Sequence, residues 1–191
     1  MTRVLMFFVM AALLLGGCAT PMQKLDPEAI ARIKPKQTTR AEVEQLFGAP
    51  KNLISGSDGA KVAEYSIFRL SPPPINTVFA RSMSVLYDNR DLVRDVVHTE
   101  VHKTIEETQI EPLLPPELVI KLGITLEKVN KRFGPPDFQT FTPEGGHVSE
   151  WYYTKVQRSH SAKNTFHRLI VITDDAGYVR NFRMAQSQGA R

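Results

Sequence analysis

Few residues in the sequence have types and spacings that could do chemistry. His98, Glu100 and His102 alternate along a predicted strand, so their side chains would share one face and could bind a divalent ion weakly. The acid does not directly follow the first histidine, so the run is not the His-Glu-x-x-His pattern of metalloproteases. We interpret these residues as a solvated strand end.

Recognised catalytic patterns are absent from the sequence. It has no nucleophile elbow, no glycine-rich phosphate loop and no cysteine pair for a metal. Glu64 and Glu150 occupy matched positions, as do Arg94 and Arg180, and we interpret them as ion pairs across a sheet. We expect His147 at the surface. The protein is therefore predicted not to be an enzyme and to need no metal or cofactor.

Cys18, the one cysteine of the chain, lies in a motif with a clear chemical use. Arg3 precedes an apolar run over residues 4–15, which is too short to span a bilayer as a helix and is typical of a signal peptide. The run ends in Leu15-Gly16-Gly17-Cys18, which resembles the bacterial lipobox. We predict lipidation of Cys18; the alternative is a small-residue cleavage site with an incidental cysteine.

The residue after the cysteine, Ala19, bears on the location of the protein. By resemblance to the sorting rules of bacterial lipoproteins, a residue other than Asp favours the outer membrane. The acyl chains of such a lipoprotein exceed what stable anchoring requires. We expect a lipid anchor in the outer membrane and a body facing the periplasm. The formal net charge of +4 permits contact with anionic lipid or an acidic partner and requires neither, and no nucleic-acid partner is expected.

Two segments of the sequence match each other in a single register. Residues 33–96 align with residues 119–182 without a gap, and Tyr65 aligns with Trp151. A shared register over this length indicates that one fold occurs twice. The identical pairs are Thr39/Thr125, Val43/Val129, Phe47/Phe133, Gly48/Gly134, Pro50/Pro136, Gly59/Gly145, Val62/Val148, Glu64/Glu150, Val85/Val171, Asp88/Asp174, Val93/Val179 and Arg94/Arg180.

The sequence of each copy predicts two short helices followed by an antiparallel sheet of three or four strands. Asp26-Pro27-Glu28 is typical of a helix start, and Thr39 with Glu42 fits a capping box that opens a second helix. Lys128 replaces the acid in the second copy, so we expect the cap at Thr125 to be weaker. Alternating apolar residues predict strands at 62–70, 77–87, 92–99, 148–156, 165–173 and 178–184.

The predicted fold class is α+β, with two tandem copies of a helix-helix plus sheet unit. A signal peptide over residues 1–17 and a lipidated tether over 18–25 precede the first copy at 26–102. The second copy covers 116–191. The join at 103–115 carries acids and prolines and is expected to be an exposed, fairly stiff linker.

The repeated motif resembles a known family. Thr-x3-Val-x3-Phe-Gly-x-Pro, followed by an aromatic strand residue, occurs at residues 39–50 with Tyr65 and at residues 125–136 with Trp151. It resembles the SmpA/OmlA (BamE-like) family of outer-membrane lipoproteins, and the tandem form is similar to the β-lactamase-inhibitor-protein fold. The resemblance implies a non-catalytic module that binds envelope proteins, including outer-membrane assembly components. An inhibitor of an envelope hydrolase is the alternative.

Two surfaces are candidates for partner binding. We expect Tyr65 and Trp151 to be core anchors beneath the helices; the alternative is an exposed binding aromatic. Strand alternation places Phe68 and Tyr152 on the opposite sheet faces, which suits protein recognition if the helices cover one side only. Arg158, Lys163 and Arg168 form a basic stretch in the second copy. This stretch is a candidate for contact with anionic headgroups or an acidic partner, and the alternative is a solvated hairpin.

Overall fold

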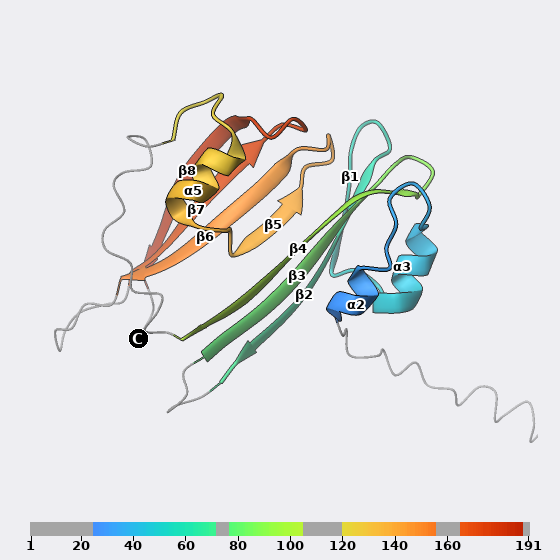
Figure 1. Cartoon of the computed structure of the whole chain (residues 1–191), viewed down its shortest axis with the longest axis horizontal. Coiled ribbons are helices and arrows are strands. Elements are labelled where there is room, and N and C mark those ends of the chain that lie inside the picture. Colours follow the sequence, from blue (N-terminus) through green and yellow to red (C-terminus); the bar gives the residue numbers. More distant parts are fainter. Residues whose placement is uncertain (1–24, 72–76, 105–119, 156–164, 189–191) are drawn as a thin grey trace, which may run out of the picture.

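The computed structural model describes residues 25–71, 77–104, 120–155 and 165–188 (Figure 1). The predicted signal peptide, Cys18, Arg158, Lys163 and most of the predicted linker lie outside these ranges. Within the described part of the chain, no helix is long and apolar enough to cross a membrane.

The first copy has two short helices and a four-stranded antiparallel sheet. The sheet order is β1-β2-β3-β4, so each strand pairs with its neighbour in sequence. The strand that the sequence had not placed is β1, which is short and lies at the sheet edge. The elements are α2 (Pro27–Ile30), α3 (Arg40–Phe47), β1 (Asn52–Ser55), β2 (Lys61–Leu70), β3 (Thr77–Tyr87) and β4 (Val93–Thr104).

The second copy repeats the four-stranded antiparallel sheet, with order β5-β6-β7-β8. Isolated bridges join Thr39 to Leu92 and Thr125 to Tyr178, at aligned positions of the two copies. The duplication predicted from the sequence is therefore a duplication of structure. A helix pair is described in the first copy only. The elements of the second copy are α5 (Leu126–Phe133), β5 (Phe138–Phe141), β6 (His147–Lys155), β7 (Thr165–Thr173) and β8 (Val179–Gln188).

α3 and α5 each pack an aromatic side chain onto one face of their own sheet. Tyr65 is fully buried, with its ring centroid 6.1 Å from that of Phe47. Trp151 is buried in the same way, 6.3 Å from Phe133, and its Nε1 donates to the carbonyl of Gly134 at 3.0 Å. These aromatic residues are the core anchors that the sequence predicted, and each copy has its own apolar core.

The two sheets meet through β5, which packs on the face of the first sheet that the helices leave uncovered. Figure 1 shows β5 beside β4, with α3 and α5 on the outer sides of the assembly. The Thr140 hydroxyl donates to Glu64 Oε1 at 2.9 Å and lies 2.8 Å from Ser84 Oγ. Phe141 adds an apolar contact with Val62 and Leu86. Polar and apolar contacts together therefore join the copies.

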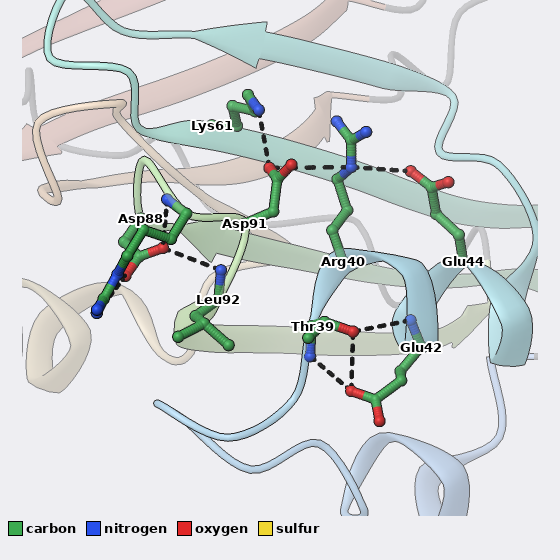
Figure 2. Close-up of polar contacts among 9 residues, drawn as sticks. Thr39, Arg40, Glu42, Glu44, Lys61, Asp88, Asp91 and Leu92 are labelled. Carbon is green, nitrogen blue, oxygen red and sulfur yellow. Dashed lines mark hydrogen bonds and ion pairs between the residues drawn. The ribbon is translucent and has the colours of Figure 1, made fainter.

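The two helix caps differ as the sequence predicted. Thr39 forms a full capping box: its hydroxyl accepts from the Glu42 backbone N–H at 3.3 Å, and its own N–H donates to Glu42 Oε2 at 2.7 Å (Figure 2). The Thr39 backbone bond also lowers the pKa of Glu42. Thr125 makes only one such contact, at 3.4 Å from the Lys128 N–H.

This asymmetry predicts unequal effects of removing the two caps. Thr39→Ala should lower the free energy of unfolding by about 1–2 kcal/mol, because it leaves the Glu42 backbone N–H without its acceptor and removes the bond from the Thr39 hydroxyl to the Glu42 carboxylate. Thr125→Ala should cost about 0.5 kcal/mol, the lower end of the range for caps. Urea denaturation of both variants measures the difference, and an equal or reversed ranking would contradict it.

Candidate protein-binding groove

A groove of about 490 Å³ lies between the two sheets, beyond the point where β5 begins. The first sheet supplies one wall from its uncovered face, including Val78, Ala80 and Val101. The second sheet supplies Phe138 and Tyr152. The groove is therefore mostly apolar and is built from both copies.

Strand alternation explains why Phe68 and Tyr152 reach this groove. Phe68 lies an even number of residues after Glu64 on β2, and Tyr152 lies an even number after Glu150 on β6. Both side chains therefore point to the sheet face opposite the one that buries Tyr65 or Trp151 beneath the helices. Phe68 is 65% exposed and Tyr152 is 46% exposed. The predicted placement on the helix-free faces is confirmed. The structure adds that both side chains line one groove.

One side of the groove is closed by an ion pair between Lys103 on β4 and Asp137, which precedes β5. The second oxygen of Asp137 accepts the backbone N–H of Tyr152 at 2.8 Å. Asp137 thus joins the first sheet to the strand that carries Tyr152. The side-chain charge of Lys103 is compensated within the protein.

The Tyr152 side chain is held by Glu150 and Arg168. Its hydroxyl donates to Glu150 Oε2 at 2.5 Å, and the guanidinium of Arg168 lies 5.7 Å from the ring centroid. Arg168 Nε donates to Glu150 at 2.9 Å, and a second nitrogen pairs with the other carboxylate oxygen. Burial, followed by the bond to Glu150, raises the pKa of Tyr152, and the bond to Glu150 raises that of Arg168. These contacts hold the Tyr152 ring as one wall of the groove, with its hydroxyl protonated and donating to Glu150.

The expected pairing of the matched charges is wrong. Glu150 binds Arg168, whereas Glu64 accepts from Thr140 at 2.9 Å and from Asn52 at 3.0 Å. Arg180 binds Asp174 at 2.8 Å. The cause is the strand order: β3 or β7 lies between the strands that carry the matched glutamates and arginines, so those side chains cannot meet.

The histidines also need a correction. His147 is half-buried beside Phe141, with ring centroids 5.0 Å apart, and is not the surface residue we expected. Burial lowers its pKa, and Asp95 opposes that shift. Of the possible metal-binding run, Glu100 instead pairs with Arg81. The described residues contain no cluster of side chains able to hold a metal ion.

Sequence reasoning missed Asp137 and Phe138, because β5 is too short to show a convincing alternation. The aligned positions in the first copy are Lys51 and Asn52, so a basic and a polar residue stand where the second copy has an acid and an aromatic residue. Most aligned positions of the two copies differ, so this difference alone could not have identified the wall of the groove.

Comparison of the chain with protein-family models, curated proteins and solved structures gives no match. The likeness to SmpA/OmlA proteins thus remains a prediction carried by the repeated motif.

The Glu150 network predicts a stability difference between two arginines. Arg168→Ala should lower the free energy of unfolding by about 2 kcal/mol, because it leaves the buried Glu150 carboxylate with the Tyr152 hydroxyl as its one side-chain partner among the described residues. Arg180→Ala removes a more exposed arginine from Asp174 and should cost under about 1 kcal/mol. Thermal or urea unfolding compares the two, and equal losses would contradict the role given to Arg168.

Proposed function

We propose that the protein is a non-catalytic, lipid-anchored binding module of the outer membrane that faces the periplasm and binds envelope proteins through the inter-sheet groove. The observation that carries the proposal is an apolar groove whose aromatic wall, Tyr152, is already held in place. In line with the SmpA/OmlA-like motif, the proposed partners are components of outer-membrane protein assembly.

The composition of the groove supports a protein partner. Aromatic and aliphatic side chains form its centre, and ion pairs such as Lys103 with Asp137 lie at its edge, an arrangement typical of protein interfaces. Tyr152 is oriented by Glu150 before any partner arrives, so binding does not have to order this side chain. A pre-formed aromatic wall favours affinity.

The position of the predicted anchor fits a body held close to the membrane. Leu25 is fully buried in the first core, and its carbonyl accepts a bond from Arg81 at 2.5 Å. The stretch from Cys18 to Leu25 reaches at most about 25 Å when fully extended. A lipid on Cys18 would therefore keep the groove within a short distance of the membrane surface.

A second candidate function is inhibition of an envelope hydrolase, which the likeness to the inhibitor-protein fold suggested. The same exposed aromatic residues, Phe68 and Tyr152, would then contact the enzyme. Affinity capture from detergent-solubilised envelopes separates the two functions. Assembly components would favour the first, and a stoichiometric hydrolase would favour the second.

The proposal predicts that the groove aromatics govern capture. Phe68→Ala combined with Tyr152→Ala should reduce recovery of the bound envelope proteins at least about tenfold, since buried aromatic anchors contribute 2 kcal/mol or more at interfaces. The matched control is Leu122→Ala combined with Tyr178→Ala, which removes exposed apolar side chains that do not line the groove. Unchanged recovery with the groove variant would exclude this surface.

The anchor is tested separately. Globomycin, which blocks the lipoprotein signal peptidase, should cause the unprocessed precursor to accumulate, because processing before Cys18 requires that enzyme. Immunoblotting resolves precursor from mature chain. Normal processing in the presence of the inhibitor would count against lipidation of Cys18.

A further inference from the structure

The groove lies next to an incomplete strand pairing. β6 runs from His147 to Lys155, but β5 pairs only with residues 147–150. In the described part of the chain, residues 151–155 of β6 pair with β7 alone. Among the described residues, no strand therefore pairs with residues 151–155 on the side of β6 that β5 occupies farther along.

The direction of the backbone groups at this edge follows from two bonds. The Glu150 carbonyl accepts from the Asp137 N–H at 2.8 Å, and the Tyr152 N–H donates to the Asp137 carboxylate at 2.8 Å. Groups on alternate residues of a strand point the same way, so the Tyr152 carbonyl and the backbone of Thr154 also point to this side. The Asp137 carboxylate oxygen takes the place that a carbonyl of a neighbouring strand would fill.

The open edge lies beside an apolar surface formed by the first sheet. Val78, Ala80 and Val101 share one face of that sheet and line the groove. β5 lies on the same face, directing Thr140 to Ser84. A guest segment that continued the line of β5 would direct every second side chain onto this surface.

Charges at the groove argue against an ionic ligand. Lys103 is paired with Asp137, Arg168 with Glu150, and Arg81 with Glu100. A charged headgroup would have to displace one of these carboxylates. An acyl chain would fill the apolar space but would leave the Tyr152 carbonyl and the backbone groups of Thr154 at this edge without a strand partner. An uncharged extended polypeptide satisfies both requirements.

We propose that the groove binds an extended polypeptide segment with alternating apolar and uncharged polar side chains, which adds as a strand to the open edge of β6 and packs its apolar side chains on Val78, Ala80 and Val101. The inference deepens the proposed function and rests on it, because it specifies which part of a partner the groove takes. Such strand addition is an established mode of peptide recognition.

The test uses the whole mature chain in lipid nanodiscs and a short fluorescent peptide of alternating Val and Thr. The peptide should bind, as followed by fluorescence anisotropy, and hydrogen exchange over residues 152–155 should slow. A peptide of the same sequence with N-methyl groups on alternate residues keeps its side chains and loses its backbone donors. It should bind at least about tenfold more weakly, since two lost hydrogen bonds of about 1 kcal/mol each have that effect.

Variants locate the binding surface. Val101→Asp places a charge in the groove and should abolish binding, whereas Leu122→Asp places the same charge on an exposed residue that does not line the groove and should leave binding unchanged. If Val101→Asp does not fold, as judged by circular dichroism, Ala80→Leu fills the same surface with apolar bulk and should also abolish binding. Binding that survives in a folded groove variant would overturn the inference.

Two further outcomes would overturn it. Equal affinity for the plain and N-methylated peptides would mean that the groove takes apolar groups, such as an acyl chain, without strand pairing. Absence of peptide binding would exclude this guest. Failure of the strand-addition inference can be told apart from failure of the proposed function. Envelope capture that still depends on Phe68 and Tyr152 would preserve the proposed function. Peptide binding with slowed exchange, but without any captured envelope protein, would count against the proposed function alone.

Discussion

The hydroxyl of Thr140 lies between the two sheets, 2.8 Å from Ser84 and 2.9 Å from Glu64, and the rest of the architecture depends on this contact. Each copy can bury only one face of its sheet beneath its own helices. The opposite face of the first sheet is covered in part by β5 of the second copy. A buried hydroxyl needs hydrogen-bond partners, so Thr140 fixes where β5 lies on that face.

The groove exists because this coverage ends early. Phe141 closes the contact at one end of β5, against Val62 and Leu86. At the other end β5 begins at Phe138, because the two residues before Asp137 are prolines, which have no N–H to donate to β6. The prolines that follow α5 thus also set where β5 begins. β6 and the first sheet extend past that point with an open space between them.

Local patterns in the sequence were sufficient for the described helices and the six longer strands, and insufficient for β1, β5 and the site. The difference between the caps at Thr39 and Thr125, and the burial of Tyr65 and Trp151, follow from short-range spacing, and the structure confirms them. The partner of Glu150 could not be found in this way, because it depends on which strand lies next to β6. Packing of β5 across the other copy is a contact between distant parts of the chain, and no periodicity encodes it.

The repeat suggests where function was added to an inherited fold. Lys51 and Ser66 in the first copy contact each other through their side chains at 3.1 Å, and the aligned Asp137 and Tyr152 also contact each other, at 2.8 Å. The same pair of positions is in contact in both copies, but different atoms make the contact. In the second copy the acid reaches a backbone N–H, and the serine is replaced by a tyrosine that forms a wall of the groove. Identical residues in the two cores include Val43 and Val129, whereas Asp137, Phe138 and Tyr152 of the groove stand at positions where the copies differ.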